Sequence, residues 1–314
     1  MQQAPFHQLP DDRLAPASAF FVTADDGKRL RLALWEPEDS AAHGTVLLFP
    51  GRTEYIEKYA PVARRLTDRG YAVLAIDWRG QGMSERLQDD PRPGHIIEFS
   101  DYQRDVIEMV VAGRHIGLPE PWHLLAHSMG GCIGLAALEN DLPVQTAVFS
   151  APMWGINLRR FQHGAAIGIA YLAGRLGRGG LVAPGSGGAN TTYALEESFN
   201  ANLLTGNADE WARLMREAAH WPDLTIGGAS FAWVGKALNE CSRLSAIASP
   251  ALPMLVGLGS EEKVVSAASI RDRVAKSPRA SLFEVKGARH EILLETPDRR
   301  DAFIQAMLDH FDAG

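Results

Sequence analysis

Four short segments of this chain are apolar almost throughout, and each is followed by an irregular loop or by a segment with helical spacing. They are residues 45–49, 71–76, 122–126 and 144–150. A strand that is apolar on both faces needs cover on both faces, which a parallel sheet between two layers of helices provides. The intervening segments suit such helices, because apolar residues such as Tyr59, Val62 and Leu66 recur on one helical face. The sequence therefore predicts an α/β fold with a mostly parallel sheet.

Both ends of the chain extend this sheet. Residues 17–25 and 28–36 partly alternate between apolar and polar side chains around an Asp-Gly turn signal, which predicts an antiparallel hairpin. After residue 250 the alternation of strand and helix resumes, with strands expected at 252–257 and 281–285. The complete pattern predicts about eight strands, six of them parallel.

The alternation is interrupted in the middle of the chain. Between residues 151 and 249 the sequence shows helical pieces and a glycine-rich loop at 177–188 in place of strand-helix units. We interpret residues 151–249 as a helical cap, or lid, inserted between the two parts of the core, residues 1–150 and 250–314.

The composition of the chain limits which partners the protein can bind and which cell compartment we expect for it. Acidic residues outnumber basic ones, giving a net charge of −7, and no basic stripe is present, so we expect no nucleic-acid partner. Cys132 and Cys241 have no neighbouring metal ligands and are expected to be reduced core thiols. Residues 1–16 lack the basic start and apolar run of a signal peptide, and the apolar stretch 164–174 is too short to cross a bilayer. We expect a cytoplasmic protein, at most peripheral at the inner face of the membrane.

The strongest chemical signal lies at residues 124–131, where an apolar strand is expected to turn sharply into a helix at Ser128. Such a turn, a nucleophile elbow, exposes the serine hydroxyl and strains its backbone. The residues two before and two after must be small, and Ala126 and Gly130 are. The motif usually has glycine where Ala126 stands, a difference of one methyl group. Ser128 is the predicted nucleophile.

The chain supplies partners for this serine in the order serine, acid, histidine. His290 follows the expected strand 281–285 through a short loop, where an imidazole can accept the serine proton. The loop after strand 252–257 carries Glu262 at the acid position, with Glu261 next to it as the alternative. Acyl transfer also needs donors for the oxyanion, and we expect the backbone N–H groups of Met129 and Arg52 to supply them.

Further motifs accompany the elbow. They are Phe49-Pro50-Gly51-Arg52-Thr53-Glu54 with Lys58-Tyr59, Asp77-Trp78-Arg79-Gly80-Gln81-Gly82-Met83-Ser84, and Ala288-Arg289-His290-Glu291. With them the chain resembles the monoacylglycerol lipase and bacterial lysophospholipase branch of the α/β-hydrolases, also described as serine aminopeptidase-like hydrolases, over nearly its whole length. The resemblance implies an α/β-hydrolase fold, a lipid-like ester substrate, and structural roles for Asp77 and Arg79 in the loop beneath the nucleophile.

Two departures from the family pattern bear on the site. Pro50-Gly51 stands where monoacylglycerol lipases have His-Gly, which favours the lysophospholipase side of the resemblance. Trp78 stands where the family often has histidine, which changes the packing behind the site.

Candidate substrate contacts come from the oxyanion loop and the cap. Arg52 is suited to bind the phosphate of a lysophospholipid, and an ion pair with Glu54 is the competing interpretation. Trp154 and Phe161 are candidates to line an acyl pocket, although apolar cap residues also pack on the core without touching substrate. If the protein contacts a membrane, we expect the cap to make that contact.

The sequence therefore predicts a serine hydrolase that cleaves lysophospholipid or monoacylglycerol esters through an acyl-enzyme, with no metal or cofactor. The alternatives are a general carboxylesterase and an amidase or aminopeptidase, the latter needing an acidic anchor such as Glu196, Glu197 or Asp209. A non-catalytic ligand-binding protein on the same fold is a further alternative. The oligomeric state is not indicated.

Overall fold

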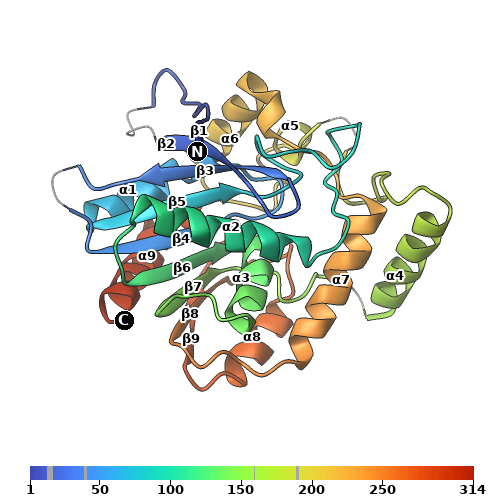
Figure 1. The fold of residues 1–314 in the computed structure, drawn as a ribbon. Helices are drawn as coiled ribbons and strands as arrows, with labels where there is room; N and C mark the ends of the chain where they lie inside the picture. The colour runs from blue at the N-terminus through green and yellow to red at the C-terminus, as the bar shows by residue number, and fades with distance from the viewer. Residues whose placement is uncertain (13–16, 39–40, 159, 189–190) are drawn as a thin grey trace.

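The computed structural model describes residues 1–12, 17–38, 41–158, 160–188 and 191–314, without the side chains of Arg160 and Phe161. Its centre is a nine-stranded sheet with the order β1-β2-β3-β5-β4-β6-β7-β8-β9 (Figure 1). The strands are β1 Gln2–Gln3, β2 Ser18–Thr23, β3 Arg29–Trp35, β4 Gly44–Phe49, β5 Tyr71–Asp77, β6 Trp122–His127, β7 Thr146–Ser150, β8 Met254–Gly259 and β9 Ala280–Val285.

Strands β4 to β9 are parallel to their neighbours within this group, and β1, β2 and β3 pair antiparallel. The prediction of six parallel strands and an N-terminal hairpin is confirmed. The sheet has one strand more than the approximate number expected, because the sequence pattern did not reveal β1. Its two residues are exposed and polar, and they join the sheet through backbone pairing with Phe20 and Phe21 of β2, which leaves no pattern in the side chains.

Helices cover both faces of the sheet (Figure 1). The helices are α1 Ala60–Asp68, α2 Asp101–Ile116, α3 Met129–Glu139, α4 Arg160–Arg175, α5 Tyr193–Glu196, α6 Ala208–His220, α7 Phe231–Ala246, α8 Ala267–Ala275 and α9 Pro297–Asp312, with 3-10 turns η1 Ile56–Tyr59, η2 Pro222–Leu224 and η3 Ile292–Leu294. Helices α1 and α9 share one buried apolar cluster with the sheet, and α2, α3, α7 and α8 share the other. The central strands β4, β5, β6 and β7 are buried throughout because each of their faces meets one of these clusters.

Between β7 and β8 the chain forms α4 to α7, and none of its described residues adds a strand to the sheet. We call residues 151–249 the cap segment; its division from the core as a separate domain stays a prediction. Helix α4 packs against α7 at the outer edge of the molecule (Figure 1). No helix among the described residues combines the length and the apolar composition needed to cross a bilayer.

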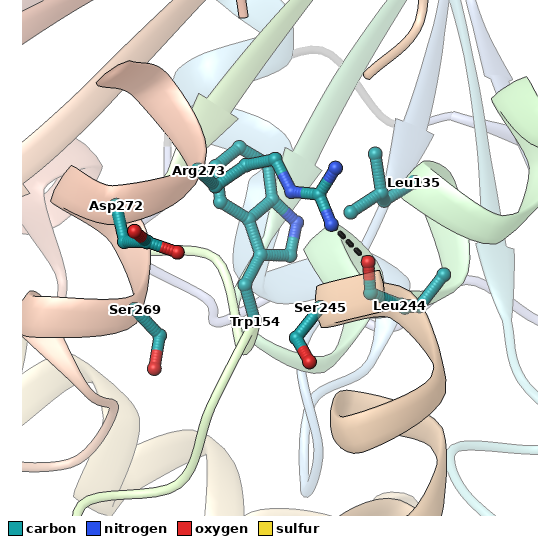
Figure 2. A pocket seen from close by; sticks show the side chains of 7 residues that line it. All are labelled: Leu135, Trp154, Leu244, Ser245, Ser269, Asp272 and Arg273. Atoms are coloured by element: carbon teal, nitrogen blue, oxygen red, sulfur yellow. Dashed lines mark hydrogen bonds between the residues drawn. The ribbon is translucent and has the colours of Figure 1, made fainter. Parts of the chain in front are cut away.

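Arg273 of α8 ties the end of α7 to the core. Its guanidinium donates to the carbonyl of Leu244, as Figure 2 shows, and to the carbonyl of Ile247 at 3.0 Å. The last carbonyls of a helix have no partner within the helix, so an arginine here satisfies groups that burial would otherwise penalise. The cavity beside Arg273 and Trp154 measures about 50 Å³, far below the roughly 300 Å³ or more of a small-molecule site.

A fully buried arginine fixes the loops below the carboxyl ends of the central strands. Arg31 on β3 donates to Asp77 at 2.7 Å and to both oxygens of Glu57 at 2.8 Å. Asp77 in turn accepts the backbone N–H groups of Ile56, at 2.9 Å, and Met83, at 2.8 Å. The structural role expected for Asp77 follows from these bonds, because one carboxylate joins two loops to the sheet.

Replacing Arg31 by Met should destabilise the protein strongly, since it leaves the carboxylates of Asp77 and Glu57 buried without a cation. Breaking a buried ion pair costs about 3–5 kcal/mol, and we expect a loss of that size in the free energy of unfolding in urea. Arg29→Met is the matched control, because Arg29 lies two positions earlier on β3, is exposed and contacts the ring of Phe21. That control should cost less than about 1 kcal/mol; equal losses would contradict the role given to Arg31.

Candidate active site

Ser128 occupies a one-residue turn between the end of β6 and the start of α3. Its backbone has φ 51° and ψ −117°, a region that residues other than glycine rarely adopt. The turn is tightly enclosed, because a side chain at Gly130 would place its Cβ 2.0 Å from the carbonyl oxygen of Phe49. Ala126 fits in place of the usual glycine and is fully buried. The backbone thus has the geometry of a nucleophile elbow.

The structure brings Ser128, His290 and Glu262 together from three loops. His290 Nε2 lies 2.9 Å from Ser128 Oγ, and His290 Nδ1 lies 2.7 Å from Glu262 Oε2. Glu261, the alternative acid, is exposed. In this arrangement Glu262 orients the imidazole so that Nε2 faces the serine hydroxyl.

The second oxygen of Glu262 accepts the backbone N–H groups of Val264, at 2.6 Å, and Val265, at 3.1 Å. Burial alone would raise the pKa of Glu262, but His290 and these two N–H groups together lower it below its ordinary value. The group is therefore a carboxylate at neutral pH, as an orienting acid requires.

The expected oxyanion donors lie on the two segments that border Ser128. Met129 is the first residue of α3, and its N–H is one of those that find no partner within a helix. The loop after β4 passes so close that a Cβ on Gly51 would lie 3.1 Å from Ser128 Cβ. Among the described residues, none accepts a hydrogen bond from the backbone N–H of Arg52. Both N–H groups are thus placed to bind an oxyanion, and their role stays a prediction.

Side chains hold this loop from behind. Trp78 Nε1 donates to the carbonyl of Pro50 at 2.9 Å, and Gln81 Nε2 donates to that of Gly51 at 2.8 Å. Trp78, the departure from the usual histidine, is fully buried and serves as a support for the loop.

Comparison with known proteins places the chain in a family. A family model described as "Serine aminopeptidase, S33" matches residues 40–297. The chain belongs to this family. It is 33% identical over 282 residues to lysophospholipase L2 of Escherichia coli strain K12, covering 85% of this chain and 80% of that protein. It is 31% identical to a probable lysophospholipase L2 of Haemophilus influenzae, covering 98% and 96% of the two chains.

A solved structure of similar fold is a soluble variant of monoglyceride lipase from Saccharomyces cerevisiae. The TM-score is 0.75 at 18% identity, and the match covers 98% of this chain and 99% of that one. The expected α/β-hydrolase fold is confirmed.

This S33-family hydrolase holds a cluster of buried charges directly behind His290. Lys58 donates to Glu54 and, at 2.7 Å, to Glu291. Glu54 also accepts from the backbone N–H of Gly51 and, at 2.5 Å, from the hydroxyl of Tyr59. Glu54 therefore links the oxyanion loop to the interior, a role that sequence reasoning missed. The available signal was the spacing of Glu54 and Lys58, four residues apart in an otherwise buried segment.

His127, next to the nucleophile, completes the cluster. Its Nδ1 donates to the carbonyl of Ser150 at 2.9 Å, and its Nε2 lies 3.3 Å from Glu291 Oε2. Burial would lower the pKa of His127, but the carboxylates of Glu291 and Glu54 raise it above its ordinary value. The ring centroid of His127 lies 4.9 Å from that of His290, so the cluster is in direct contact with the triad.

The ligand atoms of Glu54, His127 and Glu291 lie within 4.8 Å of one another, a spacing open to a metal ion. Lys58 already contacts both carboxylates. Burial favours its neutral amine, but Glu291 and Glu54 raise the pKa of Lys58 above its ordinary value, so the ammonium persists. The ammonium of Lys58 therefore already serves as the cation for the carboxylates of Glu54 and Glu291. We assign no metal to this cluster.

The side chains of Arg52, Trp154 and Phe161 were predicted to contact substrate. Arg52 does not pair with Glu54, so that interpretation is wrong; its guanidinium instead donates to the carbonyls of Gly227 and Ser186 in the cap segment. Trp154 is buried and donates to the carbonyl of Gly131 at 3.0 Å. Phe161 lies in α4, but its side chain is outside the described part of the structure. For Trp154 and Phe161, contact with substrate stays a prediction. The two cysteines are buried and unpaired, as expected.

Replacing His127 by Gln should lower stability in a way that depends on pH. Because the folded-state pKa of His127 is raised, its charged form stabilises the protein fully below the unfolded value near 6.5. This contribution is lost as the pH rises through the folded pKa. We expect a difference in unfolding free energy of about 2 kcal/mol near pH 6, smaller near pH 9. The groups facing His127 (Glu54, Lys58, Glu291 and His290) are common to both proteins; a difference that grows with pH would contradict the charge state proposed.

Proposed function

We propose that this protein hydrolyses carboxylic esters of lipids with one acyl chain, lysophospholipids or monoacylglycerols, through an acyl-enzyme intermediate. The observation that carries the proposal is the continuous hydrogen-bonded chain from Ser128 Oγ through His290 to Glu262, at 2.9 and 2.7 Å. The choice of lipid esters is supported by the lysophospholipase L2 proteins to which the chain is similar.

In the first half of the proposed reaction, His290 Nε2 accepts the proton of Ser128 as Oγ attacks the ester carbonyl. The carbonyl oxygen takes up the negative charge, and the N–H groups of Met129 and Arg52 bind it. The tetrahedral intermediate then expels the alcohol, which takes the proton from His290. In the second half, water loses a proton to His290 and attacks the acyl-enzyme, and Ser128 recovers its proton as the fatty acid leaves.

An aminopeptidase on this fold needs an acidic anchor for the substrate's amino group, and the candidate anchors are engaged locally or exposed. Glu196 accepts the backbone N–H of Gly188 at 2.9 Å, and Glu197 accepts that of Ser198 at 2.9 Å. Asp209 is exposed in the first turn of α6. These contacts favour the ester hydrolase.

Substitutions in the chain of hydrogen bonds test the mechanism. Ser128→Ala should abolish release of fatty acid from lysophosphatidylcholine and from monoacylglycerol, and should abolish labelling by a fluorophosphonate. Glu262→Gln should lower kcat by about 10³-fold, because the amide no longer orients or stabilises the imidazolium. Glu261→Gln is the matched control and should change kcat by less than about twofold. Similar losses in both glutamate variants would contradict the assignment of Glu262.

We also propose that the cap segment contacts the lipid surface through an exposed apolar patch. By this patch we mean five exposed apolar side chains of α4 and the loop that follows it, Ile169, Tyr171, Leu172, Leu176 and Leu181. Elsewhere on α4, Ala170 and Ala173 are buried, and Ala170 packs against Gly235 of α7. Since the small residues serve the packing on α7, the large apolar side chains are left facing outward, as in a helix that lies on a membrane interface.

The double variant Tyr171→Ser with Leu172→Glu should weaken binding to phosphatidylcholine vesicles by about tenfold, because it removes two exposed apolar side chains. Co-sedimentation with the vesicles measures this binding. Hydrolysis of a short-chain soluble ester should be retained, which shows that the site is intact. Ile107→Glu is the control, since Ile107 is as exposed on α2, outside the patch; equal weakening by this control would contradict the proposal.

A further inference from the structure

Arg52 carries a positive charge into the space between the oxyanion loop and the cap segment. Its Nη1 donates to the carbonyl of Gly227 at 3.1 Å, and its Nη2 to the carbonyl of Ser186 at 3.5 Å. Its Cζ lies 5.3 Å from the ring centroid of Trp233. All of these partners are neutral, and among the described residues no carboxylate forms an ion pair with Arg52.

Two deeply buried arginines, Arg31 and Arg79, are neutralised by carboxylates, whereas buried Arg273 binds carbonyl oxygens as Arg52 does. Arg31 pairs with Asp77 and Glu57, and Arg79 pairs with Asp105 and Asp26, each at 2.7 or 2.8 Å. Burying a charge without a counterion is costly. Burial accordingly lowers the pKa of Arg52 to about 10, which still leaves the guanidinium protonated at neutral pH. An anion entering this space would replace the missing counterion.

The position of Arg52 relates this charge to the reacting atoms. Its backbone N–H is the proposed oxyanion donor, so its Cα lies next to the carbonyl of a bound ester. About five bonds of roughly 1.5 Å lead from that Cα to the guanidinium carbon. In a lysophospholipid acylated at a terminal glycerol carbon, about six bonds of similar length separate the ester carbonyl carbon from the phosphorus. The two lengths are alike, which a contact between the phosphate of the leaving group and the guanidinium requires.

The guanidinium lies close to glycine backbone. A Cβ built on Gly94 would come within 2.9 Å of Arg52 Nη1. Backbone without side chains therefore borders the guanidinium. The two hydrogen bonds to carbonyls use two of its five N–H donors. The others are available to a phosphate, whose geometry suits the planar fork of arginine.

We propose that the Arg52 guanidinium binds the phosphodiester of a lysophospholipid headgroup while the backbone N–H of the same residue binds the ester oxyanion. This inference rests on the proposed ester hydrolysis and adds the substrate class: phospholipids with one acyl chain are preferred over neutral monoacylglycerols. A single residue would then contact both the ester oxyanion and the phosphate of the leaving group.

The test compares kcat/KM on lysophosphatidylcholine and on monoacylglycerol of the same acyl chain. In Arg52→Gln the ratio of the two values should fall by about tenfold or more, because a charge-assisted contact to phosphate is lost on one substrate only. Arg52→Lys, which keeps the charge and loses the fork, should show an intermediate ratio. Equal losses on both substrates would overturn the inference and leave the ester hydrolase standing, whereas no release from either lipid by the wild-type protein would overturn both.

Arg86→Gln is the matched control. Arg86 also lacks a carboxylate partner among the described residues and donates to the cap carbonyls of Asp223, at 2.7 Å, and Thr225, at 3.4 Å, but it lies outside the oxyanion loop. Its substitution should leave the substrate ratio as in the wild type. An equal fall in the ratio would mean that net charge near the cap is responsible, and the assignment to Arg52 would fail.

A second measurement uses the wild-type protein and does not depend on the folding of a variant. Glycerol 3-phosphate should inhibit hydrolysis of monoacylglycerol competitively, with glycerol at the same concentration giving at most one-tenth of the inhibition. Inorganic phosphate distinguishes a lipid headgroup from a free anion as the ligand. Inhibition by inorganic phosphate as strong as by glycerol 3-phosphate, or equal inhibition by glycerol, would overturn the headgroup assignment.

Discussion

The side chain of Glu54 connects the loop after β4, which faces Ser128, to the buried charges of the interior. One of its oxygens accepts from the backbone N–H of Gly51 and the hydroxyl of Tyr59, and the other from Lys58. Lys58 also donates to Glu291, which lies beside His127 at the base of the elbow. The loop that faces Ser128 and the strand that leads to it are thus held by one set of charges. Preorganised donors of this kind need no rearrangement when charge develops during a reaction.

A fixed site of this type is costly to build. Two carboxylates, an ammonium and an imidazole are withdrawn from water, and such groups stabilise the fold only where each finds its partner. The same holds for Arg31 with Asp77 and Glu57 one layer further from the nucleophile. Both sets lie beneath the carboxyl ends of the parallel strands, and the faces of the sheet are packed by the two apolar clusters.

Much of this architecture could be predicted from the sequence, because it rests on patterns along the chain. The central strands are apolar on both faces, and the elbow requires small residues at fixed spacing from Ser128, so both leave a local signal. His290 and Glu262 were found because each follows a predicted strand. By contrast, β1 joins the sheet through backbone bonds alone. Short-range reasoning paired Arg52 with Glu54, and this was wrong because Glu54 is occupied by its own loop, while the acceptors of Arg52 lie 134 and 175 residues further along the chain.

In addition to the apolar packing of α7 on the sheet, arginines outside the cap segment donate to its backbone. Arg52, Arg86 and Arg273 all bind carbonyl oxygens of this segment, at Gly227, Thr225 and Ile247 among others. A carbonyl is present whatever the side chain, so these attachments place few demands on the identity of the cap residues that receive them. Side chains of the cap segment can therefore change by substitution while its hydrogen bonds to these arginines are kept. For protein engineering, this makes the cap the natural place to alter substrate preference without redesigning the catalytic core.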